Sequence, residues 1–351
     1  MGIFISIIIL SLLIFFHELG HFIVAKLFGV KVEVFSIGFG KKLFKKIYKG
    51  TEYCISAIPL GGYVQMKGQD DLNPAVSSQD EDSYNAKSPW QRIGILLAGP
   101  GANFLLAFVL YMVIANIGVD KLAPVVGEVA KNSPAFKAKL QKNDKIIKIN
   151  GVKIVAWDDI KDVIVHSEGT LNLLIQRGGK LSKVKVIPRI ERVENIFKEK
   201  EKRKIIGILP KGDVVHIKYS FLNSFSFAYN ETVNASKFIL IGLKKMVEGV
   251  VPAKEMGGVI SILKVTSQAV SVGIVALLGL TALISVNLGV LNLLPIPALD
   301  GGHIVFNLYE IFFKRAPSEK VMYRLTYAGW AILLSLMLFS TYNDISRLIE
   351  G

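Results

Sequence analysis

The feature that most constrains this chain is an apolar run at its start, from Gly2 to about Phe28, which contains His17-Glu18-Leu19-Gly20-His21. In lipid a backbone satisfies its polar groups only within a helix or a closed barrel, so a run of this length predicts a membrane-spanning helix. Ionisable residues are costly at that depth and mark functional sites. Because positions i and i+4 share one helix face, His17 and His21 can bind the same ion.

The HExxH spacing is typical of zinc proteases. Imidazole nitrogen suits zinc, and two histidine ligands leave room for a third ligand and a water. Glu18 lies beside the histidine face, where we expect it to act as a general base toward that water. A chance HExxH in a soluble helix is the alternative, and the apolar surroundings argue against it.

The composition indicates several membrane spans together with a polar domain. Hydrophobic residues make up 51% of the chain and charged residues 20%, with a net charge of +14. The lysines are spread among apolar spans and no basic-aromatic motif appears, so the positive charge favours anionic lipid over nucleic acid as a partner. Cys54 is the single cysteine, which excludes an intramolecular disulfide and a cysteine-based metal site. Met1 to Leu10 carry no Lys or Arg, so the first run reads as a retained helix and not a signal peptide.

The remaining chain alternates between predicted membrane and polar segments. Further spans are expected at 93–117, 273–294 and 327–342, the second of which contains Gly99-Pro100-Gly101-Ala102-Asn103-Phe104. Small residues let membrane helices approach closely, and Asn103 is expected to hydrogen-bond across the bundle. Residues 30–34 alternate in period two, Gly38 and Gly40 interrupt the pattern, and Lys49-Gly50 and Gly61-Gly62 mark turns. Residues 30–66 therefore predict two or more short hairpins beside the first span.

The polar segments differ in character. Residues 69–82 are acidic and predict a solvated loop. From about 123 to 189 the order of elements is strand, helix, hairpin, helix, hairpin, and with the stretch KNDKIIKINGVKI it resembles a circularly permuted bacterial PDZ domain. Residues 191–204 form a charge run that predicts a solvated linker, and 215–251 predict amphipathic helices on the membrane surface.

The third predicted zinc ligand follows the third apolar run. Asn292-Leu293-Leu294-Pro295-Ile296-Pro297-Ala298-Leu299-Asp300-Gly301-Gly302-His303 cannot be a regular helix, because two prolines stand two residues apart. Irregular backbone at membrane depth is tolerated only inside protein or beside a water-filled cavity. The residues alone leave both Asp300 and His303 open as third ligand, with Glu310 further along the chain. His166 and His216 lie in polar segments and are expected to be ordinary histidines.

The pairing of HELGH with NLLPIPALDGGH resembles the site-2 protease family, in its bacterial regulator-of-sigma-E branch. The resemblance extends over the hairpin region, GPGANF and the PDZ-like segment. It implies that His17, His21 and Asp300 bind zinc, that Glu18 is the catalytic base, and that Asn292 handles substrate. His303 then becomes a supporting or packing residue. Many relatives carry two PDZ domains, whereas this sequence shows one.

We therefore predict a membrane α-helical protein of about four transmembrane helices, with a membrane-associated β-hairpin region and one inserted α+β PDZ domain. The expected domains are 1–118 with HExxH and the β region, 119–190 as the PDZ domain, 191–271 as linker and surface helices, and 272–351 with the NxxPxPxLDG motif. Lysines in 31–49 and basic residues at 314, 315 and 320 place these loops in the cytoplasm of a bacterial inner membrane, with the PDZ domain periplasmic.

The predicted function is that of an intramembrane zinc endopeptidase which cleaves single-pass membrane proteins, such as an anti-sigma factor or remnant signal peptides, in regulated intramembrane proteolysis. One alternative is a catalytically inactive scaffold that presents its PDZ domain, and Glu18 argues against it because a scaffold has no use for a base. A metal transporter is the other alternative, and the nearly charge-free second and fourth spans argue against it.

Overall fold

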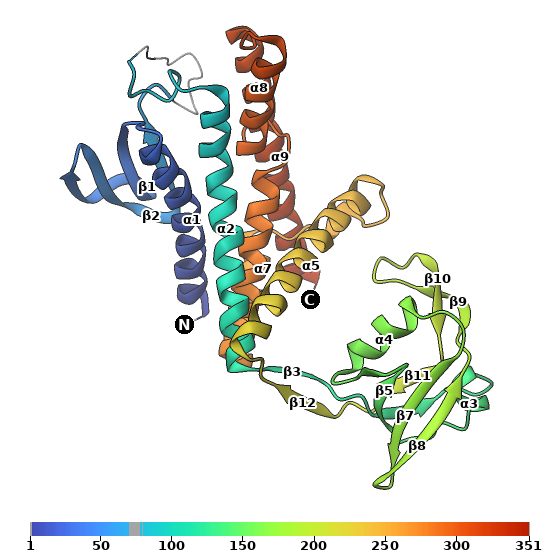
Figure 1. Ribbon diagram of the computed structural model, residues 1–351. Helices are drawn as coiled ribbons and strands as arrows, with labels where there is room; N and C mark the ends of the chain where they lie inside the picture. The colour runs from blue at the N-terminus through green and yellow to red at the C-terminus, as the bar shows by residue number, and fades with distance from the viewer. Residues whose placement is uncertain (1, 70–77, 79, 351) are drawn as a thin grey trace. The chain divides into compact units, whose positions relative to one another are not determined.

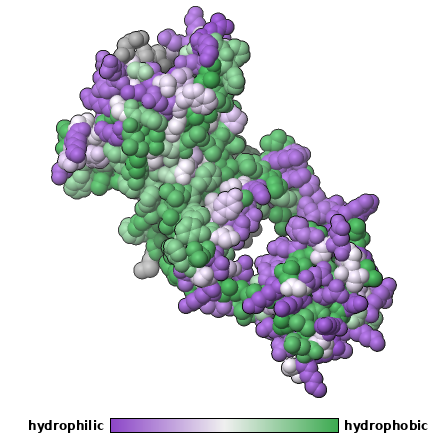
Figure 2. Space-filling model, viewed as in Figure 1, coloured by the Kyte–Doolittle hydropathy of each residue, from purple (hydrophilic) through white to green (hydrophobic). Residues whose placement is uncertain are grey.

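The computed structural model describes residues 2–69, 78 and 80–350. The chain divides into two compact units, one formed by Met1–Ile114 with Phe221–Gly351 and the other by Ala115–Ser220. Apolar side chains gather on the helices of the first unit, whereas polar side chains predominate on the second (Figure 2). This division matches the predicted contrast between membrane segments and a polar insert.

Four helices of the described residues are long and apolar enough to cross a membrane: α1 (Gly2–Leu27), α2 (Pro89–Ile117), α7 (Ile274–Asn292) and most of α9 (Glu319–Glu350). They run in nearly the same direction in Figure 1. The prediction of four spans is confirmed, although α9 is about twice as long as the predicted 327–342. Pro100 lies within α2, and the helix continues through it.

Shorter helices complete the first unit: α5 (Phe221–Val247), a 3₁₀ turn η1 (Ala253–Glu255), α6 (Val259–Val272) and α8 (Asp300–Phe313). Helices α6 and α8 were not predicted from the sequence. Gly273, with φ of 135°, separates α6 from the span α7, which explains why one apolar stretch forms two helices. Of the helices predicted in 215–251, a single one forms, and its Phe225 ring lies 5.8 Å from that of Phe108 on α2.

The β region consists of β1 (Val32–Tyr48) and β2 (Thr51–Met66), and each of them reverses direction once. The predicted turn at Lys49-Gly50 is confirmed, and both residues have positive φ. The second predicted turn, at Gly61-Gly62, is also confirmed, because 52–55 run parallel to 34–37 whereas 62–65 run antiparallel to them. Residues 34–37 therefore lie between 52–55 and 62–65 of β2. Gly38 and Gly61, with φ of 92° and 145°, give the strands the freedom to bend there.

Part of the predicted acidic loop lies outside the described residues, at 70–77 and 79. The described part is fixed to the end of β2, since Lys67 Nζ lies 2.7 Å from a carboxylate oxygen of Asp80 and 2.6 Å from one of Asp82. Hydrogen bonds from the Lys67 ammonium lower the pKa of both carboxyl groups. The backbone N–H of Lys31 also donates to the Asp82 carbonyl, so this part of the loop is tied to the start of β1.

The second unit contains a four-stranded sheet in the order β6-β5-β7-β8. Its elements are β3 (Val119–Leu122), β4 (Val126–Val129), α3 (Pro134–Lys137), β5 (Lys145–Ile149), β6 (Val152–Lys153), α4 (Trp157–His166), β7 (Leu171–Arg177) and β8 (Lys180–Val186). The predicted order of strand, helix, hairpin, helix and hairpin is confirmed from β4 to β8. Ile146, Ile149, Ile160 and Leu173 are at the centre of a buried apolar core.

The predicted linker at 191–204 is wrong, because these residues form a hairpin of β9 (Arg189–Glu194) and β10 (Lys200–Ile205). The charged side chains stay exposed while the backbone groups of the two strands pair with one another. Composition alone does not reveal this backbone pairing. Two further strands follow: β11 (Ile208–Pro210) pairs with β4, and β12 (Val214–Ile217) pairs with β3. The compact unit therefore extends past residue 190.

A buried ion pair fixes the end of β7 in the second unit. The Arg177 guanidinium donates to both carboxylate oxygens of Asp144 at 2.7 Å, and the backbone N–H of Gln141 donates to Oδ2 at 2.8 Å. Asp144 is fully buried, and its carboxylate raises the pKa of Arg177. Removing the guanidinium would leave a buried carboxylate with a single donor.

We expect Arg177→Met to lower the free energy of unfolding of this unit by about 1–3 kcal/mol, the usual cost of an unsatisfied buried polar group. Denaturant unfolding followed through the fluorescence of the buried Trp157 measures the change. Lys180→Met, at a nearby exposed position of β8, removes an equal charge and should leave the midpoint unchanged. Equal unfolding midpoints for Arg177→Met and Lys180→Met would show that the Arg177–Asp144 ion pair does not stabilise this unit.

Candidate metal centre

Helix α1 brings two imidazoles to one point. His17 and His21 stand one turn apart on the same helix face, and their Nε2 atoms are 3.2 Å apart. Their side chains are 12% and 8% exposed. A membrane helix is held together by its own backbone hydrogen bonds, so α1 remains regular although it carries polar side chains.

Asp300 reaches the same point from a broken stretch of chain. Helix α7 ends at Asn292, and α8 begins at Asp300. The turn between them packs tightly on the first turn of α8, where a Cβ added to Gly301 would lie 2.2 Å from the carbonyl oxygen of Leu294. A Cβ on Gly302 would lie 2.3 Å from the carbonyl oxygen of Ile296. The two glycines after Asp300 therefore permit the close turn that carries the carboxylate to the histidines.

The three side chains have the spacing of zinc ligands. Asp300 Oδ2 lies 3.3 Å from His17 Nε2, and Oδ1 lies 3.5 Å from His21 Nε2. Tetrahedral ligands with metal bonds of roughly 2.0–2.1 Å stand about 3.3 Å apart, which agrees with these distances. The buried Oδ2 has no hydrogen-bond partner among the described residues, as suits an atom that faces a cation. The donor set of two imidazoles and one carboxylate therefore fits zinc.

Helix α2 orients both histidines. The carbonyl oxygen of Ile95 lies 2.8 Å from His21 Nδ1, so it can accept the Nδ1 proton and leave Nε2 free for a metal. Gly99 makes room for this ring, because a Cβ there would lie 2.2 Å from His21 Nε2. The small residues of this helix thus pack against the histidines themselves.

Asn103 is the corresponding partner of His17. Its Nδ2 lies 3.2 Å from His17 Nδ1, while its buried Oδ1 has no hydrogen-bond partner among the described residues. Nitrogen and oxygen of an amide are assigned from the hydrogen-bond network. With the amide turned over, Oδ1 accepts the Nδ1 proton of His17 and leaves Nε2 to face the cluster. Ser285 on α7 holds this residue in place by donating to the Asn103 carbonyl at 2.8 Å.

A cavity of about 560 Å³ opens beside the cluster. It is lined by His17, Glu18, His21, Phe39, Gly62, Tyr63, Val64, Gln65, Met66, Gln69, Leu96, Asn292, Ala298, Leu299, Asp300, His303 and Trp330. Glu18 and Asn292, both singled out from sequence, therefore share the cavity with the three clustered side chains. Residues 62–66 of β2 form one wall, and a Cβ on Gly62 would lie 3.4 Å from Glu18 Cγ.

The other candidate ligands lie outside the cluster. The metal-binding group found among the described residues consists of His17, His21 and Asp300. His303 lines the cavity, and its ring contacts that of Phe306 at 5.9 Å. Glu310 pairs instead with Arg92 at 2.8 Å.

His166 and His216 belong to the second unit and have local partners there. His166 Nδ1 lies 2.8 Å from the carbonyl oxygen of Asp162, and His216 Nδ1 lies 2.7 Å from a carboxylate oxygen of Asp120. Both contacts agree with the prediction that these are ordinary histidines.

Four apolar helices and a buried cluster of two histidines and an aspartate define a multi-pass membrane protein with a metal site. Comparison with known proteins agrees. The model of peptidase family M50 matches residues 5–336. A Campylobacter jejuni protein provisionally named a zinc metalloprotease is 49% identical over 98% of this chain and 93% of its own length. Similarly named proteins of Helicobacter pylori strain J99 and Clostridium acetobutylicum are 40% and 38% identical, over 98% of this chain and 99% and 97% of theirs.

The chain belongs to peptidase family M50, the site-2 protease family. It is a zinc metalloprotease, and its cofactor is zinc. The resemblance first recognised in HELGH and NLLPIPALDGGH is thereby confirmed.

Helix α2 does more than its sequence predicts. GPGANF is interpreted above as a helix-packing motif, whereas in the structure Asn103 also contacts His17 and Gly99 also packs against His21. The available signal was a lone amide within an apolar span, since a buried amide needs a polar partner. The identity of that partner required the tertiary structure.

We expect Asn103→Ala to weaken zinc binding by roughly 10- to 100-fold, as loss of a partner behind a metal-ligating histidine usually does. Zinc retention during titration with a chelator measures the effect independently of protease activity. Thr281→Ala is the control, because this hydroxyl is buried in the neighbouring α7 and bonds only to its own helix, at the Leu277 carbonyl. Unchanged zinc affinity in Asn103→Ala would remove its proposed role.

Proposed function

We propose that His17, His21 and Asp300 hold one zinc ion and that Glu18 is the general base of peptide hydrolysis. The observation that carries the proposal is the set of contacts of 3.2–3.5 Å that join the three side chains beside a cavity lined by Glu18. Zinc supplies Lewis-acid chemistry, polarising a carbonyl oxygen and making water a better nucleophile.

Glu18 takes a proton from the attacking water and delivers it to the nitrogen of the leaving amine. The new bond joins the water oxygen to the scissile carbon, and the carbon–nitrogen bond breaks. A carboxylate suits both transfers, since it acts first as base and then as acid.

The substrates that fit best are membrane-spanning segments of single-pass proteins. A helical substrate hides its carbonyl groups, so it must become extended before cleavage. Residues 62–66 pair with β1 on one side and line the cavity, and their other edge has no strand partner among the described residues. An extended substrate can add to this edge as a further strand. Asn292, at the end of α7, lines the same cavity, which supports a role in contacting the substrate.

We infer a role in regulated intramembrane proteolysis in a bacterial inner membrane, with an anti-sigma factor or remnant signal peptides as substrates. Support comes from the family, from four apolar helices and from the organisms of the relatives. Within the second unit, the segment 119–190 is proposed to be a PDZ domain, and the order of its elements supports that interpretation. We propose that 1–118 is the transmembrane half with HExxH and the β region, and that 272–351 is the half with the NxxPxPxLDG motif. Segment 191–271 is proposed to be a linker with surface helices, apart from the hairpin found within 191–205.

We expect Glu18→Gln to keep zinc and fold but to lose peptide cleavage by at least roughly 10²-fold, the lower range for a general base. Cleavage of a reconstituted single-pass substrate and metal analysis of the same sample give the two measurements. Asp300→Ala is the matched comparison, because it should lose zinc as well as cleavage. His303→Ala should retain the metal, and loss of zinc from this variant alone would show that the ligand set is wrong.

The second unit is proposed to be periplasmic and to exclude substrates that still carry a bulky periplasmic part. Replacing 123–213 by a short Gly-Ser linker keeps the paired ends Leu122 and Val214 close together. We expect the shortened protein to cleave untrimmed substrate, which the full chain spares. A folded, zinc-loaded variant that no longer cleaves trimmed substrate would make the unit a substrate receptor instead.

The orientation is tested in the same system through the thiol of an engineered Ser182→Cys on β8, in a Cys54→Ser background. A membrane-impermeant reagent added from the periplasmic side should label it. Labelling by a permeant reagent alone would invert the proposed topology.

A further inference from the structure

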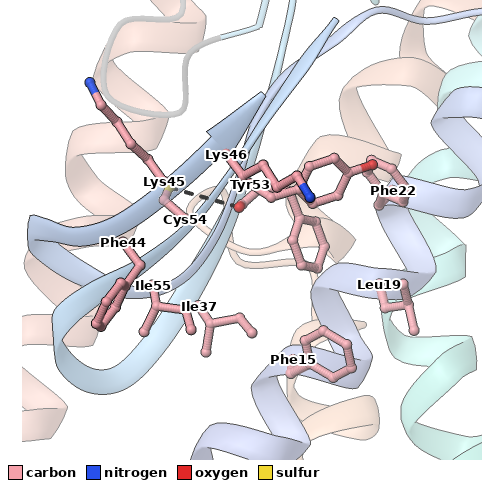
Figure 3. Close-up of a pocket in the computed structure, with 11 residues that line it drawn as sticks. Phe15, Leu19, Phe22, Ile37, Phe44, Lys45, Lys46, Tyr53, Cys54 and Ile55 are labelled. Carbon is pink, nitrogen blue, oxygen red and sulfur yellow. Dashed lines mark hydrogen bonds between the residues drawn. The ribbon is translucent and has the colours of Figure 1, made fainter. Parts of the chain in front are cut away.

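A second cavity, of about 480 Å³, lies between α1 and the β1–β2 hairpin. It is lined by Phe15, Leu19, Phe22, Phe35, Ile37, Phe44, Lys45, Lys46, Tyr53, Cys54 and Ile55. None of these residues lines the cavity beside the metal cluster. Figure 3 shows the α1 side chains facing those of the hairpin across the space.

The walls on α1 form a continuous apolar stripe. Phe15, Leu19 and Phe22 stand at positions i, i+4 and i+7, which share one helix face and span about 10 Å along the axis. The ring of Phe35 braces the stripe from β1, since its centroid lies 5.8 Å from that of Phe15 and 5.2 Å from that of Phe22. This shape and lining suit a flexible hydrocarbon chain laid along the helix.

Positive charge gathers at one end of the stripe. Lys26 follows Phe22 by one turn, and its Nζ lies 5.9 Å from the centre of that ring. Lys46 belongs to the cavity lining and extends beside Tyr53 toward Phe22, whereas the neighbouring Lys45 extends away from it (Figure 3). Neither Lys26 nor Lys46 forms an ion pair with a residue that the structure describes. Of the two acidic residues on this hairpin, Glu33 and Glu52, the second is paired with Lys42.

The hairpin also exposes a large apolar surface. Phe44 and Ile47 are each 72% exposed, and they alternate with lysines along β1. Such a combination is typical of segments that lie at the boundary between headgroups and acyl chains. An apolar cavity at this boundary fills with hydrocarbon more readily than with water, because water there would lack polar partners.

We propose that this cavity binds one anionic glycerophospholipid, with its phosphate at Lys26 and Lys46 and an acyl chain along Phe22, Leu19 and Phe15. Charge favours a lipid over an apolar substrate segment, since Lys26 and Lys46 offer two cationic groups at the end of the stripe to an anionic headgroup. The position of the cavity also favours a lipid over a substrate peptide. His17, Glu18 and His21 line the other cavity, so a peptide bound in this one would lie beside none of them.

The lipid would hold the hairpin against α1. The same sheet supplies residues 62–66 to the wall of the metal-centre cavity, so a bound lipid supports the strand edge beside Glu18. Binding itself, and not turnover, is therefore the first property to measure, which separates this inference from the proposed protease mechanism.

The experiment uses the full chain reconstituted in nanodiscs of phosphatidylcholine with a minor share of phosphatidylglycerol, followed by detergent extraction and native mass spectrometry. We expect about one phosphatidylglycerol to remain bound to each chain. Lys26→Gln with Lys46→Gln should weaken this retention by roughly twenty- to thirtyfold, at about one surface-lysine contribution each. Ile55→Trp, which fills the cavity without changing charge, should weaken it as well.

Lys41→Gln with Lys49→Gln is the matched control, because it removes equal charge from the hairpin at two exposed residues outside the cavity. This pair should retain the lipid. Equal losses in both double variants would reduce the effect to general surface charge and overturn the site. Absence of retained phosphatidylglycerol in the unmodified chain, or its one-for-one displacement by a substrate peptide, would also overturn the proposal.

Discussion

The structure depends on the cost of placing ionisable groups among apolar helices. His17, His21 and Asp300 are each mostly buried and lie within 3.5 Å of one another, so each offsets the desolvation of the others. Because these residues come from the two ends of the chain, their contact fixes α1 against the start of α8. A zinc ion bound to the three would strengthen the same constraint.

Helix α2, which contacts both histidines, fixes the orientation of their rings within this cluster. Helix α2 offers His21 a backbone carbonyl and a gap at Gly99, and it offers His17 an amide at Asn103. Because Asn103 is the single polar side chain of α2 between 93 and 110, the two histidines are the polar groups that this part of the span serves. The rings are consequently held in orientation before any metal arrives, which is the preorganisation that a catalytic centre needs.

The β1–β2 hairpin joins the two cavities of the first unit. Its bent strands place residues 62–66 at the metal centre, while Phe44, Lys45 and Lys46 lie at the apolar cavity on the other side of α1. The proposed strand edge for substrate and the proposed cationic rim for lipid are therefore parts of one sheet. This arrangement offers a physical route by which the surrounding bilayer can influence the geometry beside Glu18.

The sequence by itself determined what depends on neighbouring residues. Apolar length predicted the four spans, a spacing of four placed His17 and His21 on one face, and two prolines predicted the break before Asp300. Only the tertiary structure decided which of Asp300 and His303 reaches the histidines, because that choice depends on how a turn after α7 packs on α8. The same reason explains Asn103 and the hairpin within 191–205, whose partners are set by contacts between distant segments and not by local pattern.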